Sequence, residues 1–168
     1  MIKFLLNNIF SFVLLVLLQV IVFDHIQFSG LINPYFYVIF ILLLPFETPG
    51  WFLLLSSFFL GFFVDVFYHT LGMHSSACTF IAFLRPAVLK AFAPRDGYEP
   101  GTLPRIHFFG LTWFLKYSLI LILAHHFVLF YIEMFRFSDF FITFFKVILS
   151  TMFTGFLVVI SLYFIFRR

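Results

Sequence analysis

Long apolar stretches dominate this sequence and decide what the chain can fold into. The first, Phe4 to Phe23, contains no charged residue, and at about 1.5 Å per helical residue it covers the roughly 30 Å hydrocarbon core of a bilayer. Inside a bilayer every backbone N–H and C=O group must be satisfied within the segment, so such a stretch is a helix. Together the apolar stretches predict six transmembrane helices, over residues 4–23, 35–46, 51–68, 72–92, 110–132 and 140–166.

Composition argues against a soluble domain. Of the 168 residues, 64% are hydrophobic and 10% are charged, whereas soluble domains have about 45–50% and about 25%. We therefore expect an all-α, polytopic integral membrane protein with a single transmembrane domain over residues 1–168. Its one substantial loop, residues 93–108, contains three prolines and two glycines. A loop this short leaves no room for a separate catalytic or nucleotide-binding domain.

The second predicted helix, residues 35–46, is too short for an ordinary membrane span and is expected to be short, tilted or partly re-entrant. The distribution of Lys and Arg nevertheless favours counting it. With six crossings, both termini and the loop 93–108 lie on one side of the membrane, and the other side receives only Arg136. Because basic residues are retained in the cytoplasm, this predicts a cytoplasmic N-terminus and C-terminus. The basic residues on the cytoplasmic side are then Lys3, Lys90, Arg95, Arg105, Lys116, Arg167 and Arg168.

Asp65 and Lys146 lie inside predicted helices, where each charge costs about 2.5–3.5 kcal/mol on insertion scales. They fall at matching depth in the outer half of two antiparallel helices, and each belongs to a stripe of small or polar residues at spacing four. If the two stripes face each other, the carboxylate and the ammonium group form a buried ion pair. The alternative is that Lys146 reaches the outer interface while Asp65 lines a small hydrated recess. The stripes are Ser57, Gly61 and Asp65, and Lys146, Ser150 and Thr154.

The other ionisable residues give weaker signals. His125 and His126 point about 100° apart on a helix, so a metal site formed by both is disfavoured. His69 and His74 are expected near the outer interface, and Arg85, followed by Pro86, is expected to be structural. The sequence contains no phosphate-binding loop, metalloprotease motif or nucleophile motif. We therefore expect no enzymatic activity, no catalytic, cofactor-binding or metal-binding residues, and no nucleic-acid partner.

One segment resembles a known family. Gly61-Phe62-Phe63-Val64-Asp65, followed by Leu71-Gly72-Met73-His74-Ser75, is similar to the glycine, three apolar residues, aspartate and downstream leucine-glycine stretch of the bacterial rod shape-determining protein MreD family. Length, helix number, the cytoplasmic N-terminus and the short central loop also resemble that family across essentially the whole chain. The resemblance assigns architectural roles to four residues: Gly61 would allow close helix approach, Asp65 would hold a polar contact, and Gly72 and His74 match the downstream pattern.

The resemblance implies a non-enzymatic scaffold of the cell-elongation machinery in the bacterial inner membrane. Such a scaffold would bind a single-span MreC-like protein and connect, directly or indirectly, to MreB and the peptidoglycan synthase complex. The basic loop from Arg95 to Arg105 would contact a partner or anionic headgroups, or would simply be solvated. The alternative function is a substrate-binding membrane subunit of a vitamin or small-metabolite importer. That function needs polar and aromatic groups around an outer-half pocket, and the candidates are Trp51, Asp65, His125, His126 and Lys146.

Overall fold

The computed structural model describes residues 2–23, 32–99, 101–135 and 139–165, and side chains from residue 9 to residue 164 within these ranges. The described residues form helices and no β-strand, which confirms the all-α fold. Arg136, Arg167 and Arg168, which entered the charge argument, lie outside the described residues, as does the side chain of Lys3. The elements are α1 (Ile2–Ile21), the 3₁₀ helix η2 (Phe36–Val38), α2 (Ile39–Leu43), α3 (Gly50–Tyr68), α4 (Met73–Ala91), α5 (Ile106–Met134) and α6 (Phe140–Ile165).

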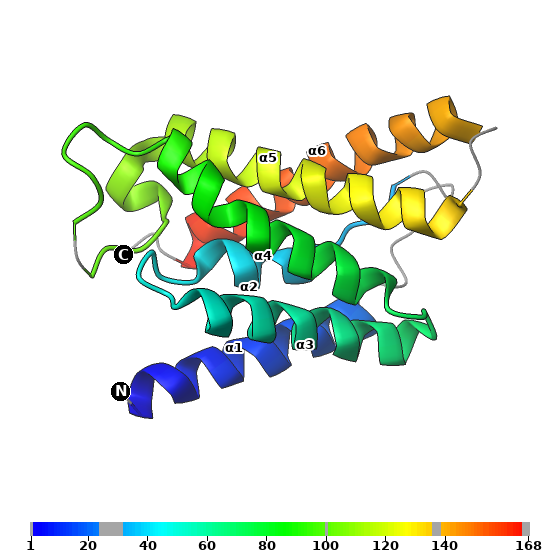
Figure 1. The fold of residues 1–168 in the computed structure, drawn as a ribbon, viewed down its shortest axis with the longest axis horizontal. Coiled ribbons are helices and arrows are strands. Elements are labelled where there is room, and N and C mark those ends of the chain that lie inside the picture. Colours follow the sequence, from blue (N-terminus) through cyan, green and yellow to red (C-terminus); the bar gives the residue numbers. More distant parts are fainter. Residues whose placement is uncertain (1, 24–31, 100, 136–138, 166–168) are drawn as a thin grey trace.

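Successive elements run back and forth along the bundle (Figure 1). α3 packs against α4, α4 against α5 and α5 against α6, while α1 packs against α3 and the segment that contains η2 and α2. α1 begins and α6 ends at the same end of the bundle, which also carries the connection between α4 and α5; we call it the loop end (Figure 1). The turn between α3 and α4 lies at the opposite end, which we call the turn end.

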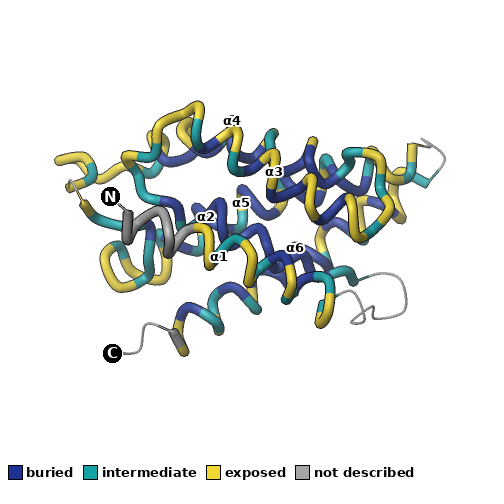
Figure 2. Tube along the Cα trace, turned by 90° about the horizontal axis from the view of Figure 1, so that it is seen from below, coloured by how far each residue is buried: buried dark blue, intermediate teal, exposed yellow. Residues whose placement is uncertain are grey.

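Within the described residues, three helices are long and apolar enough to cross a membrane: Gly50–Tyr68, Ile106–Met134 and Phe140–Phe164. Their buried faces point to the bundle interior and their exposed faces point outward (Figure 2). The outward faces carry large aromatic side chains, and such a surface is compatible with lipid rather than with water. The chain is therefore a membrane protein. Examples on the outward faces are Phe59, Phe63, Phe141, Phe145 and Phe156.

The segment between α1 and α3 differs from the helix predicted over residues 35–46. Only Phe36–Val38 and Ile39–Leu43 are helical, and extended backbone, which covers about twice the length per residue, completes the passage through the bundle. All eight helical positions except Leu43 are buried. The predicted helix is longer than the observed helical part, because the apolar run is surrounded by protein rather than lipid. We call residues 33–45 the internal segment.

The connection at the loop end is folded onto the bundle. The Tyr98 hydroxyl donates to the Leu89 carbonyl at 2.8 Å, and the ring of Tyr98 stacks on Phe46 with centres 4.1 Å apart. The Trp113 indole donates to the Phe92 carbonyl at 2.9 Å. A helical turn over residues 106–109 precedes the predicted start of α5, where Gly110 breaks the helix with the non-helical φ 80° and ψ 165°. That region is essentially restricted to glycine, and it allows one helical turn to precede the bend.

Candidate functional site

Asp65 lies near the end of α3 and caps the beginning of α4. Its carboxylate accepts hydrogen bonds from the backbone N–H groups of His74 and Ser75, at 3.0 and 2.9 Å. It also accepts from the hydroxyls of Thr70 and Ser75, at 2.6 and 2.5 Å. The first N–H groups of a helix have no partner within that helix and attract negative charge. Asp65, only 4% exposed, therefore satisfies four donors and fixes the turn between the two helices.

Gly61 lies one helical turn before Asp65 and allows α4 to approach α3. A Cβ atom at this position would lie 2.5 Å from the carbonyl carbon and oxygen of His74 and from the Cα atom of Ser75. Gly72 precedes α4 with φ +80°, a conformation that L side chains rarely adopt. The structure thus brings Gly61, Asp65, Gly72 and His74 together in a single helical hairpin. We call these four residues the hairpin site.

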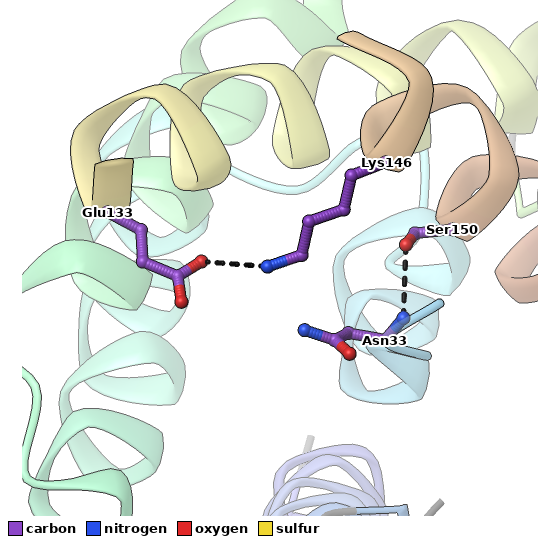
Figure 3. Close-up of polar contacts among 4 residues, drawn as sticks. All are labelled: Asn33, Glu133, Lys146 and Ser150. Carbon is purple, nitrogen blue, oxygen red and sulfur yellow. Dashed lines mark hydrogen bonds and ion pairs between the residues drawn. The ribbon is translucent and has the colours of Figure 1, made fainter. Parts of the chain in front are cut away.

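The predicted ion pair between Asp65 and Lys146 is wrong. The Lys146 ammonium nitrogen lies 3.5 Å from Glu133 Oε2 (Figure 3) and 4.4 Å from the centre of the Phe130 ring. Matching depth in the membrane was a poor guide, because α3 packs against α4 and α6 packs against α5. The donors for Asp65 come from α4 and the adjoining turn instead.

Ser150 and Thr154, the other members of the α6 stripe, bind the start of the internal segment. Ser150 Oγ accepts the Asn33 N–H at 3.0 Å (Figure 3), and Thr154 Oγ1 accepts the Tyr35 N–H at 3.3 Å. From α1, the Gln19 amide oxygen accepts the Phe36 N–H at 2.8 Å. These backbone groups have no helical partner, so α1 and α6 supply the missing acceptors.

Arg85 and Tyr117 hold the other end of the internal segment. The Arg85 side chain is 1% exposed, its Nε donates to the Tyr117 hydroxyl at 2.8 Å, and its terminal nitrogens donate to the Leu44 and Pro45 carbonyls. Tyr117 donates to the Leu42 carbonyl at 2.9 Å. A cation is favourable where a helix leaves carbonyls unpaired. The expected structural role of Arg85 thus takes the form of a cap on α2. In the sequence, the only signal for this role was the position of Arg85 inside an apolar helix.

A third polar group lies between the internal segment, α4 and α5. The Tyr37 hydroxyl lies 2.8 Å from His74 Nδ1 and 2.9 Å from His125 Nε2, and Cys78 Sγ lies 3.9 Å from the same His125 nitrogen. We call Tyr37, His74, Cys78 and His125 the histidine–tyrosine cluster. His74 lies in the first turn of α4 and is 2% exposed, so its ring faces the protein interior. The adjacent His126 has other partners, the Ile122 carbonyl and Thr154.

The buried polar side chains therefore form hydrogen bonds largely with one another and with the backbone of the same chain. Within the ranges that the structure describes, no group of three or more His, Cys, Asp or Glu residues could hold a metal ion. Comparison of the chain with protein-family models, with curated proteins and with solved structures gives no match. The helical fold and its long apolar helices define the class of protein as a helical membrane protein.

Replacement of Gly61 by alanine is expected to destabilise the hairpin site by about 1–3 kcal/mol, because the added Cβ meets backbone atoms that cannot rotate away. Thermal unfolding of the purified protein in detergent micelles measures the effect. Gly50→Ala is the matched control, since a Cβ there has nothing within 4 Å. Equal melting temperatures for the two variants would show that α4 does not depend on the close approach.

Proposed function

We propose that this chain is a non-enzymatic membrane scaffold of the MreD type, acting in bacterial cell elongation. The observation that carries the proposal is the hairpin site, where the four residues singled out by the family resemblance meet. Gly61 and Gly72 permit the backbone geometry, and Asp65 binds the first turn of α4. Each of these is a structural task that positions two helices, as a scaffold requires.

The polar interior supports a scaffold over an importer subunit. Asp65, His125 and His126 would be ligand contacts in an importer, yet each is at most 4% exposed. Asp65 accepts four protein donors, and both histidines have protein hydrogen-bond partners. Trp51, another candidate, is 69% exposed and lies in the first turn of α3, which begins at the loop end. A ligand would have to displace these internal bonds in order to bind.

The proposed topology has six membrane crossings with both termini in the cytoplasm of a bacterium, in its inner membrane. The internal segment is the second crossing, and it is shielded from lipid by the surrounding helices. In support, the loop end carries Lys90, Arg95 and Arg105, and basic residues are retained on the cytoplasmic side. The partner is a single-span MreC-like protein, with MreB and the peptidoglycan synthase complex bound directly or indirectly.

Depletion of the protein in its host, followed by microscopy, tests this function. Cells are expected to lose their elongated shape and their pattern of wall growth. Expression of the wild-type chain or of Asp96→Ala, an exposed loop variant, should restore both, whereas Asp65→Ala should not. A tagged chain should also retain the MreC-like protein after detergent extraction. Cells that keep their shape on depletion contradict the proposal, and loss of uptake of one metabolite would favour the importer.

A further inference from the structure

The histidine–tyrosine cluster is not explained by a scaffold function, because an apolar core would hold the helices together without buried imidazoles. We infer that this cluster is a proton-operated latch: at neutral pH it holds the internal segment against α4 and α5, and protonation of its histidines releases the segment. The inference stands independently of the proposed function, since it concerns only contacts within this chain.

The number of hydrogens in the cluster makes it sensitive to protons. Tyr37 has one hydroxyl hydrogen and lies within hydrogen-bond distance of two imidazole nitrogens, so one ring must donate to it and the other must accept from it. His125 Nδ1 is buried without a hydrogen-bond partner. A hydrogen on Nδ1 would be an unsatisfied buried donor, so the neutral ring carries its hydrogen on Nε2 and donates to Tyr37. Tyr37 in turn donates to His74 Nδ1.

A proton added to either ring breaks this arrangement. On His74 it occupies Nδ1, the acceptor of the Tyr37 hydrogen, and leaves the Tyr37 hydroxyl hydrogen without that partner. On His125 it occupies Nδ1 and creates a charged, buried N–H group without an acceptor. The cluster is fully enclosed, because Tyr37, Cys78 and His125 are each 0% exposed. Burying an uncompensated charge is costly, and opening to water avoids that cost.

The surroundings hold one negative charge, the Asp65 carboxylate, whose four hydrogen bonds come from backbone N–H groups and hydroxyls rather than from an imidazole. From α3, the facing titratable groups are Asp65 and Tyr68, and Asp65 already accepts four hydrogen bonds. α4 contributes His74 and Cys78, and α5 contributes His125 and His126. From the internal segment Tyr35 lies against all three imidazoles, with ring centres 5.2 to 6.0 Å apart. α1 presents the neutral Gln19, and α6 presents Thr154, with Lys146 and its partner Glu133 beyond Phe130.

The direction of the pH effect follows from proton binding. In the open form the imidazoles reach water and take up protons below about pH 6.5, whereas the closed form requires them neutral. The open form therefore binds more protons, and acidification shifts the equilibrium toward it. Each histidine that is protonated only in the open form raises the open fraction by up to about tenfold per pH unit.

Cys78 provides the measurement, because it is the only cysteine of the chain and lies inside the cluster. The full-length protein in detergent micelles is treated with an aromatic disulfide reagent that reacts with thiols at acid pH. A reference variant, Cys78→Ala with Ala93→Cys, has its thiol in the exposed loop. We define the protection of Cys78 as the labelling rate of the reference variant divided by the labelling rate of Cys78. This ratio removes the intrinsic pH dependence of the reagent. We expect the protection of Cys78 to fall at least about tenfold between about pH 7.5 and pH 5.

Variants assign the effect to the cluster. His125→Gln removes one of the two titrating rings and should lose about half of the pH dependence on a logarithmic scale, whereas His107→Gln, an exposed histidine, should keep all of it. Tyr37→Phe removes the bridging hydroxyl and should label rapidly already at neutral pH. Protection that is equal at both pH values overturns the inference, as does a pH dependence that is undiminished in both His125→Gln and Tyr37→Phe. A parallel loss of helical circular dichroism at pH 5 also overturns it, since the chain would then be unfolding globally.

Discussion

Asp65→Ala is expected to lower the free energy of unfolding by about 3 kcal/mol or more. The substitution leaves the His74 and Ser75 N–H groups without acceptors in a buried turn, and each unsatisfied buried donor costs about 1–3 kcal/mol. The Thr70 and Ser75 hydroxyls lose their acceptor as well. Denaturant titration in mixed micelles, followed by circular dichroism, measures the change. Asp96→Ala removes an exposed loop carboxylate and should stay within about 0.5 kcal/mol of the wild type.

Two further variants separate the capping role of Asp65 from an ionic one. Asp65→Asn keeps one acceptor oxygen and should lie between wild type and Asp65→Ala. The double exchange Asp65→Lys with Lys146→Asp should be no more stable than Asp65→Lys alone, since Lys146 pairs with Glu133. Rescue by the double exchange would mean that the two residues interact after all and that the cap on α4 is secondary.

Arg85→Met is expected to cost about 2–4 kcal/mol and to loosen the internal segment. Methionine retains the length of the side chain, but the Leu44 and Pro45 carbonyls and the Tyr117 hydroxyl lose their donor within an apolar interior. The loss is limited because the substitution also removes a buried charge. Unfolding in micelles gives the free energy, and amide hydrogen exchange of residues 33–45 locates the effect.

Lys90→Met on the same helix is the control for Arg85→Met, because Lys90 is exposed. It should leave both the stability and the hydrogen exchange of the internal segment nearly unchanged. If the two methionine variants were equally mild, the guanidinium contacts would contribute nothing to the position of α2, and the aromatic and aliphatic packing around it would have to suffice.

The sequence predicted the long helices well because their signal is strong. The apolar runs over residues 51–68 and 72–92 place helix boundaries within one residue of α3 and α4, and the run over residues 140–166 begins where α6 begins. The internal segment was harder, since a continuous apolar run looks the same whether lipid or protein surrounds it. The predicted start at Gly110 coincides with the break in α5, and what the sequence did not predict is the helical turn over residues 106–109 before it.

The sequence predicted residues of the candidate site but not the contacts that these residues make. Asp65 stood out as a carboxylate in an apolar run, but two of its partners are backbone N–H groups, which no side-chain pattern displays. Depth arguments placed Lys146 level with Asp65, yet depth does not say on which side of the bundle a helix lies. Tyr37 was not predicted as a site residue, because the role of its hydroxyl depends on contacts with residues 74 and 125 that the sequence does not display.

The internal segment also has a consequence for biogenesis. Its helical part, three residues of η2 and five of α2, is too short to span a bilayer alone. Gln19 precedes it in the chain, whereas Arg85, Tyr117 and Thr154, which complete its backbone hydrogen bonds, are synthesised afterwards. The segment can therefore take its final place only after α6 has left the ribosome, so an early stretch of the chain is among the last to fold.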